Sequence, residues 1–211
     1  MNNLIIIGAR GYGREVYNLA IQCNGYDEEF IVKGFLDNNY KALDCFTNYP
    51  PILSSVEDYN IEKGDVFVCA LGSIEWKKHY SEIILSKGGI FINLVHPSSK
   101  ISLSTLLGKG ILIFMHSSIN DNCEIQDFVT IQGYVSIENN VKIGKWTHIN
   151  AFVYVGDQVI IGNSASLNVR ATILPRLKIN NYSIVGANSY VESNVGERKV
   201  VFGTPAIELS L

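Results

Sequence analysis

Three glycines near the amino terminus form a motif that could hold an anion. Gly8, Gly11 and Gly13 give the pattern G-x-x-G-x-G between the aliphatic run 4–7 and a segment whose apolar residues have helical spacing. Backbone N–H groups at a helix N-terminus attract anions such as phosphate. The same glycines also suit a plain tight turn between a strand and a helix, and their spacing differs from the dinucleotide fingerprint G-x-G-x-x-G. Both interpretations remain open from this motif alone.

An acidic residue is expected beside these glycines. Asp37 follows the second apolar run, 31–36, and acidic residues at the carboxyl end of this strand bind nucleoside hydroxyls in open α/β sheets. Asp37 and the glycine turn would then share one pocket. A nicotinamide dehydrogenase is disfavoured, because about ninety residues give only half of a dinucleotide-binding domain and the remainder offers no partner domain for hydride chemistry.

The elements that must position these residues are strands alternating with helices. The patterns predict strands over 4–7, 31–36 and 66–71, and helices over 14–20 and from about 74 to 85. This alternation indicates a small Rossmann-like parallel α/β sheet over roughly residues 1–92.

The rest of the chain has a period of six. Isoleucine, leucine or valine stands at every sixth position from Val95 to Val191, seventeen times without a break. This period is the hexapeptide signature of a parallel β-helix, in which each unit supplies one short strand and one turn and the aliphatic side chain points to the axis. Residues 93–211 are therefore predicted to form a β-helix that runs to about Val195. The tail from Gly196 is predicted to form a turn that leads away from the last coil, and a helix is possible at its end.

Composition limits the classes of binding partner and the cellular compartment that are expected. The net charge of −3 leaves no basic excess to neutralise nucleic acid phosphates or to bind a membrane surface. Cys23, Cys45, Cys69 and Cys123 lack CxxC spacing, so free thiols in a reducing cytosol are expected and no metal site is. No stretch approaches the roughly 18 apolar residues of a membrane span, and no signal peptide is recognisable, so a cytoplasmic location is expected.

Outward side chains of the β-helix must carry its chemistry, because the aliphatic ladders point inward. Tyr134, Trp146, Phe152 and Tyr154 are expected to be exposed on the middle coils, which is awkward in a monomer and suits a packed interface. A homotrimer is expected, with three prisms side by side and three sites between them.

Over nearly its whole length the chain resembles the bacterial sugar acyltransferases that join a small nucleotide-sugar-binding domain to a left-handed β-helix. Besides the hexapeptide run, the segments that carry the resemblance are IGARGYG at 7–13, GFLD at 34–37, NLVHP at 93–97 and VFGTPA at 201–206. The chain looks closest to the N-acetyltransferases of nucleotide-linked 4-amino-4,6-dideoxysugars and to the sialic acid O-acetyltransferases. The resemblance implies acetyl-CoA as co-substrate, lying along the β-helix between two subunits, and a nucleotide-sugar held by the first domain.

The resemblance also implies two sets of binding residues. The nucleotide-sugar would be contacted by Gly11, Tyr12, Gly13 and Asp37. The pantetheine and adenine of the coenzyme would be lined by Ala151, Gly186, Ala187 and Pro205. Three cations are candidates for the coenzyme phosphates or else form a solvated face: Arg170, Arg176 and Arg198.

The chain departs from the family at the position of its usual general base. The family has a histidine two residues after a repeat aliphatic, in a segment like I-x-H-[DE]-x-x-I-G, and segment 137–144 here reads IENNVKIG. Asn139 therefore stands in the place of the histidine, and Tyr12 likewise replaces a histidine often found in the glycine turn. Neither asparagine nor a tyrosine with a pKa near its reference value of about 10 is a good proton acceptor at pH 7.

Three interpretations of the mechanism remain open. His148 aligns with a second family histidine, so it is expected in binding or oxyanion support and could take over as base; Glu138 is a further weak base if burial raises its pKa. In the second interpretation the acceptor needs little help, since a neutral amine attacks a thioester readily whereas a hydroxyl must lose its proton as it attacks. In the third, the enzyme is impaired or does something else with the same ligands. The expected function is therefore acetylation of an amino group on a nucleotide-linked sugar. The alternatives are O-acetylation of a sugar such as sialic acid and a non-catalytic nucleotide-sugar-binding protein.

Overall fold

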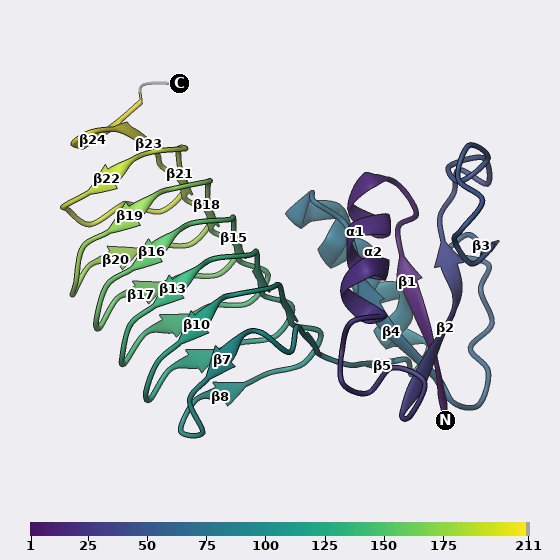
Figure 1. Ribbon diagram of the computed structural model, residues 1–211. Helices are drawn as coiled ribbons and strands as arrows, with labels where there is room; N and C mark the ends of the chain where they lie inside the picture. The colour runs from purple at the N-terminus through teal and green to yellow at the C-terminus, as the bar shows by residue number, and fades with distance from the viewer. Residues whose placement is uncertain (210–211) are drawn as a thin grey trace. The chain divides into compact units, whose positions relative to one another are not determined.

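The computed structural model describes residues 1–209 and divides into two compact units, one comprising residues 1–94 and the other starting at residue 95 (Figure 1). The boundary lies two residues beyond the position expected from the sequence. No helix in the described part of the chain is both long enough and apolar enough to cross a membrane.

The first unit is a five-stranded parallel sheet with two helices. The strand order is β3-β2-β1-β4-β5 and every pairing is parallel. Its elements are β1 (Asn2–Ile7), α1 (Gly11–Ala20), β2 (Phe30–Leu36), β3 (Ile52–Ser54), β4 (Asp65–Cys69), α2 (Ile74–Ser86) and β5 (Ile90–Phe91). The predicted α/β sheet is confirmed, while β3 went unrecognised because only three residues after Pro50 and Pro51 form it.

The apolar runs of this sheet are continuous because its central strands are covered on both faces. All five residues of β4 and the last four of β1 are buried. The glycine turn follows directly after β1, and Asp37 follows directly after β2. The buried strands therefore determine the positions of the turn and of Asp37.

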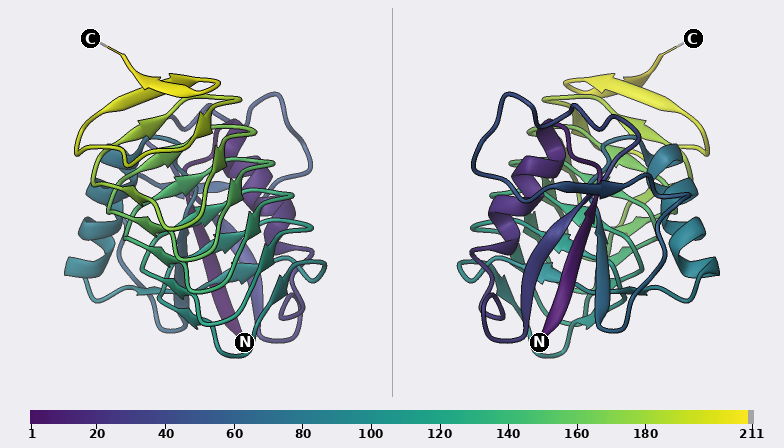
Figure 2. Two further views of the ribbon diagram at one scale, coloured as in Figure 1. Left: turned by 90° about the vertical axis from the view of Figure 1, so that its left-hand side faces the viewer. Right: turned by 90° about the vertical axis from the view of Figure 1, so that its right-hand side faces the viewer.

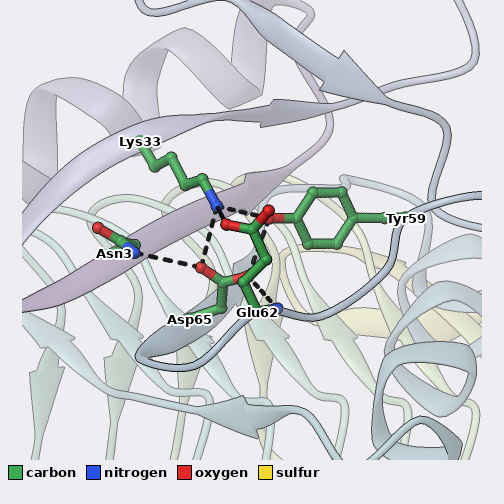
Figure 3. A network of polar contacts seen from close by, with 5 residues as sticks. All are labelled: Asn3, Lys33, Tyr59, Glu62 and Asp65. Carbon is green, nitrogen blue, oxygen red and sulfur yellow. Dashed lines mark hydrogen bonds and ion pairs between the residues drawn. The ribbon is translucent and has the colours of Figure 1, made fainter.

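A polar network joins Asn3 in β1, Lys33 in the middle of β2 and Asp65 at the start of β4 (Figure 3). The carboxylate of Asp65, whose side chain is fully buried, accepts hydrogen bonds from the Tyr59 hydroxyl at 2.9 Å and from the backbone N–H of Glu62 at 2.8 Å. Lys33 Nζ lies 3.3 Å from Asp65 Oδ1 and 2.6 Å from Glu62 Oε2. Burial alone would raise the pKa of Asp65, but these hydrogen bonds and the lysine charge together lower it.

The second unit is a parallel β-helix with three faces, and its coils are stacked one above another in Figure 2. Paired residues lie eighteen apart, as in Ser118 opposite Ser136. The first face contains β7 (Lys100–Ile101), β10 (Ser118–Ile119), β13 (Ser136–Ile137), β16 (Tyr154–Val155), β19 (Thr172–Ile173) and β22 (Tyr190–Val191). The second face contains β8 (Leu106–Leu107), β11 (Glu124–Ile125), β14 (Lys142–Ile143), β17 (Ile160–Ile161) and β20 (Lys178–Ile179).

The third face extends to the end of the described chain. It contains β6 (Leu94–Val95), β9 (Leu112–Ile113), β12 (Thr130–Ile131), β15 (His148–Ile149), β18 (Ser166–Leu167), β21 (Ile184–Val185), β23 (Val200–Gly203) and β24 (Ala206–Glu208). β24 is antiparallel to β23. A hairpin therefore stands where the sequence left room for a helix, and residues 210 and 211 lie outside the described part of the chain.

The predicted aliphatic ladders form the core. All fourteen repeat positions from Ile113 to Val191 are at most 2% exposed, whereas Val95, Ile101 and Leu107 at the start of the coil are only partly buried. Burial of about fourteen such side chains, each contributing roughly 1.5–3 kcal/mol, supplies much of the free energy that opposes chain entropy. The β-helix prediction is confirmed.

The corners between faces are made by residues in the left-handed backbone conformation. Every sixth residue from His116 to Asn188 has a φ between 54° and 66°, as at Phe152 with 62°, and none of them is a glycine. This conformation costs a non-glycine residue roughly 1–2 kcal/mol. It turns each corner N–H toward the preceding coil, where Tyr134 donates to the carbonyl of Met115 at 3.0 Å and Phe152 donates to that of Gly133 at 3.1 Å. Coil stacking thus offsets the strain.

We expect Lys33→Met to destabilise the first unit by roughly 2 kcal/mol, because it leaves the buried Asp65 carboxylate without its cation while the lysine itself is partly solvated. Urea denaturation at pH 7 measures the effect. Lys63→Met, which removes an exposed lysine, is the matched control.

The same network predicts a pH dependence. Because the pKa of Asp65 is lowered on folding from its ordinary 3.8, its contribution is present above that value and is lost as the pH falls through the folded-state pKa. The free energy of unfolding of the wild-type protein should therefore decrease at pH values below about 4. If Lys33→Met loses stability at low pH as steeply as the wild-type protein does, the assigned role of the lysine is contradicted.

Candidate functional sites

A cavity of about 340 Å³ opens at the carboxyl ends of the strands in the first unit. The connection from β1 leads to β2 on one side and that from β4 leads to β5 on the other, so the strand order reverses between β1 and β4. Open α/β sheets bind ligands at such a reversal. The lining residues come from the last residues of β1 and β2, from the segments after β1, β2, β3 and β4, and from α1 and α2: Ile7, Gly8, Arg10, Tyr12, Gly13, Leu36, Asp37, Asn38, Asn39, Val56, Ala70, Leu71, Gly72, Ser73, Trp76 and Tyr80.

The glycine turn brings the N-terminus of α1 to this cavity. Gly8 has a φ of 97°, and a Cβ on Gly13 would lie 2.0 Å from the carbonyl oxygen of Gly8. These two glycines therefore permit the close approach of helix and turn. α1 has no side-chain N-cap hydrogen bond and no acidic residue in its first turn, so the positive end of its dipole suits an anionic ligand.

Asp37 joins the two loops that border the cavity. Its Oδ2 accepts from the backbone N–H of Ala9 at 2.9 Å, and its Oδ1 accepts from that of Asn39 at 2.8 Å. The carboxylate therefore holds the glycine turn against the loop after β2. Each carboxylate oxygen retains a further lone pair that a ligand hydroxyl can use.

An aromatic pair on α2 borders the same cavity and was not anticipated from the sequence. The rings of Trp76 and Tyr80 are stacked, with centroids 5.7 Å apart and an interplanar angle of 25°, and Trp76 is 53% exposed. Asn38 donates to the Tyr80 hydroxyl at 3.2 Å. Burial, and then the charges of nearby acidic residues, raise the pKa of Tyr80. The sequence signal for this pair is the spacing of four residues between two aromatics on the solvent side of a predicted helix. The faces of their rings suit contact with a planar ring of a ligand.

Three of the four residues expected at the nucleotide-sugar lie at this cavity. Tyr12, Gly13 and Asp37 line it, whereas Gly11 begins α1 and is exposed beside it.

The residues expected at the coenzyme lie along one edge of the β-helix. Ala151, Arg170, Gly186 and Ala187 occupy the corner between the third and first faces in successive coils. The turn that contains Pro205 is hydrogen-bonded to the same corner, since Gly203 N–H donates to Ser189 Oγ at 3.2 Å. Gly186 itself lies under the Phe202 ring, where a Cβ would come within 2.3 Å.

The three candidate arginines occupy three different corners. Arg170 follows Phe152 by eighteen residues and lies over its ring at 5.7 Å. Arg198 lies 4.6 Å over the ring of Tyr182. Arg176 follows Gln158 at the remaining corner. The three arginines of one chain could therefore not all contact the phosphates of one coenzyme molecule.

The candidate catalytic residues are not brought together within one chain. Asn139 and Glu138 lie at the corner between the first and second faces, after β13. His148 begins β15 on the third face, so the second face separates it from Asn139. Asn139 borders a second, open groove of about 380 Å³ together with residues of the two preceding coils: Lys100, Ile101, Ser102, Ile119, Asn120 and Asp121.

The expected exposed aromatics divide into two kinds. Tyr134 and Phe152 are 49% and 50% exposed and are stacked at 5.0 Å, and Tyr154 is 37% exposed. Trp146 is only partly exposed, because its ring lies 4.1 Å from that of Phe128 and parallel to it. The expectation of an exposed Trp146 was therefore wrong.

Comparisons with known proteins agree with the two-part architecture. Residues 3–84 match the PglD N-terminal domain, and residues 134–169 match the bacterial transferase hexapeptide (six repeats). The chain is similar to PerB from Caulobacter crescentus, solved in complex with CoA and GDP-perosamine, with 22% identity and a TM-score of 0.88 over 100% of this chain and 98% of the other. It is also similar to the acetyltransferase domain of PglB from Neisseria gonorrhoeae, with 20% identity and a TM-score of 0.87 over 99% and 100% of the two chains.

A mutant enzyme is a further structural match. A histidine-to-asparagine mutant of perosamine N-acetyltransferase from Caulobacter crescentus was solved with CoA and GDP-perosamine, and it matches with 21% identity and a TM-score of 0.89 over 100% of this chain and 98% of the other. The fold class and the family resemblance inferred from the sequence are confirmed by these matches.

We expect Asp37→Asn to loosen the loops around the first cavity. The amide can accept one of the two backbone hydrogen bonds but presents N–H to the other donor, so the first unit should lose about 1–2 kcal/mol of stability. Thermal unfolding measures this loss. Asp44→Asn makes the same charge change at an exposed position in the same loop, and an equal effect of both variants would contradict the bridging role.

Proposed function

We propose that the protein is an acetyl-CoA-dependent N-acetyltransferase that acts on the amino group of a nucleotide-linked 4-amino-4,6-dideoxysugar, in the cytoplasm and for a bacterial surface glycan. One observation carries the proposal. An α/β unit with a cavity suited to an anion precedes a hexapeptide β-helix, and this arrangement matches over its full length a protein solved with both CoA and GDP-perosamine.

The first cavity supplies the features that a nucleotide-sugar requires. The uncapped N-terminus of α1 suits a diphosphate, and the Trp76–Tyr80 pair offers a flat surface for a nucleobase. The spare lone pairs of Asp37 suit a ribose hydroxyl. The edge that carries Ala151 and Arg170 is the proposed path of the coenzyme.

The residue at position 139 favours an amine as acceptor. An asparagine amide takes no proton near pH 7, so the acceptor has to be nucleophilic without strong general-base help. A neutral amine meets this requirement and a hydroxyl does not. The same asparagine also favours a second candidate function, a nucleotide-sugar-binding protein that has lost turnover.

We further propose a homotrimer. The stacked rings of Tyr134 and Phe152 continue a ridge that begins at His116, whose ring centroid lies 5.0 Å from that of Tyr134, and such an exposed ridge suits burial against another copy. Asn139 and His148 lie on different parts of one prism. A site that used both residues would need one from each of two copies.

Turnover tests the function directly. Purified protein with acetyl-CoA should release free thiol when a nucleotide-linked amino sugar is added and should not do so with the corresponding hydroxyl sugar. Release with the hydroxyl acceptor alone would support O-acetylation. A rise in melting temperature with nucleotide-sugar, without thiol release from any acceptor, would support the non-catalytic alternative.

Light scattering tests the oligomer. Three chains of 23.4 kDa each give an expected mass of about 70 kDa. Replacing both Tyr134 and Phe152 by glutamate should yield the monomer mass, because it places charges in the proposed interface. Tyr182→Glu, at another corner where the side chain is 44% exposed, should leave the mass unchanged. A wild-type protein of monomer mass would refute the trimer.

A further inference from the structure

The groove beside Asn139 contains two polar atoms of opposite hydrogen-bonding character. It lies at the corner between the first and second faces and extends over three successive coils. Asp121 occupies the same place in its coil as Asn139 does in the next, eighteen residues later. The role inferred for this groove rests on the proposed acyl transfer and concerns the transferred proton and the oxyanion.

The orientation of the Asn139 side chain is fixed by a backbone group. The N–H of Asp121 donates to Asn139 Oδ1 at 3.1 Å, and only the amide oxygen can accept this bond. The same link recurs where Lys145 N–H donates to Asn163 Oδ1 at 2.9 Å. Asn139 Nδ2 therefore points away from that link, and no residue in the described range 1–209 forms a hydrogen bond with it. Position 139 presents a donor.

The carboxylate of Asp121 is held in a comparable way. Its Oδ1 accepts from the hydroxyls of Ser102 and Ser104, the latter at 2.8 Å. These two hydrogen bonds lower the pKa of Asp121, so the group is ionised at neutral pH. Within residues 1–209, no side chain or backbone N–H donates to its Oδ2. Position 121 presents an acceptor.

The neighbouring carboxylate, Glu138, is not among the residues that line the groove, and both of its oxygens accept hydrogen bonds. Glu138 Oε2 accepts from the amide of Asn120 at 3.0 Å, and Glu138 Oε1 lies 3.5 Å from the hydroxyl of Ser136. Lys100, which also lines the groove, is a donor only. Asp121 is thus the carboxylate that borders the groove with an oxygen to spare.

We propose that Asp121 and Asn139 act as a pair on the two reacting groups, with the thioester supplied by a coenzyme that lies along the Ala151 edge of a neighbouring copy in the proposed trimer. Asp121 Oδ2 accepts the proton of the attacking amine, and Asn139 Nδ2 donates a hydrogen bond to the oxygen of the thioester carbonyl. The missing histidine is thereby replaced by a carboxylate from the preceding coil, and asparagine serves as the oxyanion donor.

The step balances without a further reactant. The amine nitrogen attacks the carbonyl carbon, a C–N bond forms, and the negative charge that develops on oxygen is stabilised by the Asn139 N–H. The nitrogen is then positively charged and strongly acidic, so the weakly basic Asp121 carboxylate suffices to accept its proton. The C–S bond breaks, the thiolate leaves with the electron pair, and the proton passes from Asp121 to the sulfur. The products are the amide and the free thiol of the coenzyme.

Two isosteric exchanges test the pair. Asp121→Asn keeps an oxygen for Ser102 and Ser104 but turns the free acceptor into a donor. Asn139→Asp keeps an oxygen for the backbone N–H of residue 121 but turns the free donor into an acceptor. Each is expected to lower kcat for acetylation of the amino-sugar nucleotide by about 100-fold. Asp121→Glu, which restores a carboxylate, should recover at least a tenth of the wild-type kcat.

The controls make the same exchanges at matched positions. Asn163→Asp repeats the amide-to-acid exchange at the equivalent backbone link, and Asp157→Asn repeats the acid-to-amide exchange two coils after Asp121. Both should keep kcat within about threefold of wild type. Dissociation constants for coenzyme A and the nucleotide-sugar, measured on the same samples, should stay within about threefold in all variants.

The result that overturns the pair is a loss of less than tenfold in kcat for either exchange, or a loss matched by equal weakening of both ligands. This outcome is distinct from failure of the proposed function. If wild-type protein releases no thiol with any amine acceptor, acyl transfer itself is refuted. If wild-type protein turns over and the exchanged variants do so equally well, only the assignment of Asp121 and Asn139 is wrong.

Discussion

The structure of the second unit depends on the backbone hydrogen bonds between successive coils. Each corner residue takes the left-handed conformation because its N–H then reaches an acceptor in the preceding coil, such as the Met115 carbonyl for Tyr134 at 3.0 Å or the Ser98 hydroxyl for His116 at 3.0 Å. The inward aliphatic ladders can stack only if these bonds keep the coils in register. Outward side chains consequently fall into columns with a fixed spacing of eighteen residues, as in the pairing of Ser118 with Ser136. A column combines residues that are distant in sequence into one surface, which is how Asp121 and Asn139 come to border one groove.

The first unit creates its cavity by a different device. Its strands are uniformly parallel, and the reversal of strand order beside β1 leaves the loops after β1, β2 and β4 without a covering helix between them. The glycines allow the helix N-terminus to approach that opening, and Asp37 ties two of the loops together. The proposed binding surface of this unit therefore lies at the ends of its strands, whereas the proposed binding surfaces of the β-helix lie at its corners.

The fold was predictable because its signals are periodic, and the sites were less so because theirs are not. Seventeen aliphatic residues at a spacing of six specify the coil, and the sequence places Tyr12 and Gly13 in the turn and helix that follow the first strand and Asp37 directly after the second. The role of Trp76 was not predictable, because the sequence of a helix does not distinguish an aromatic residue beside a cavity from one on the open surface. Asp121 escaped because its importance depends on which of its oxygens the two serines occupy, and composition and spacing do not specify that.

The hairpin of β23 and β24 covers the last parallel strand of the third face. A parallel β-helix exposes unpaired backbone groups at its ends, and another chain could extend the stack into a fibre. On the third face the last strand runs antiparallel to all the others, with β24 paired to β23 through residues such as Phe202 and Ile207. A further coil added in parallel register would meet a strand of the wrong direction there. Reversal of one short strand thus protects this face against end-to-end aggregation.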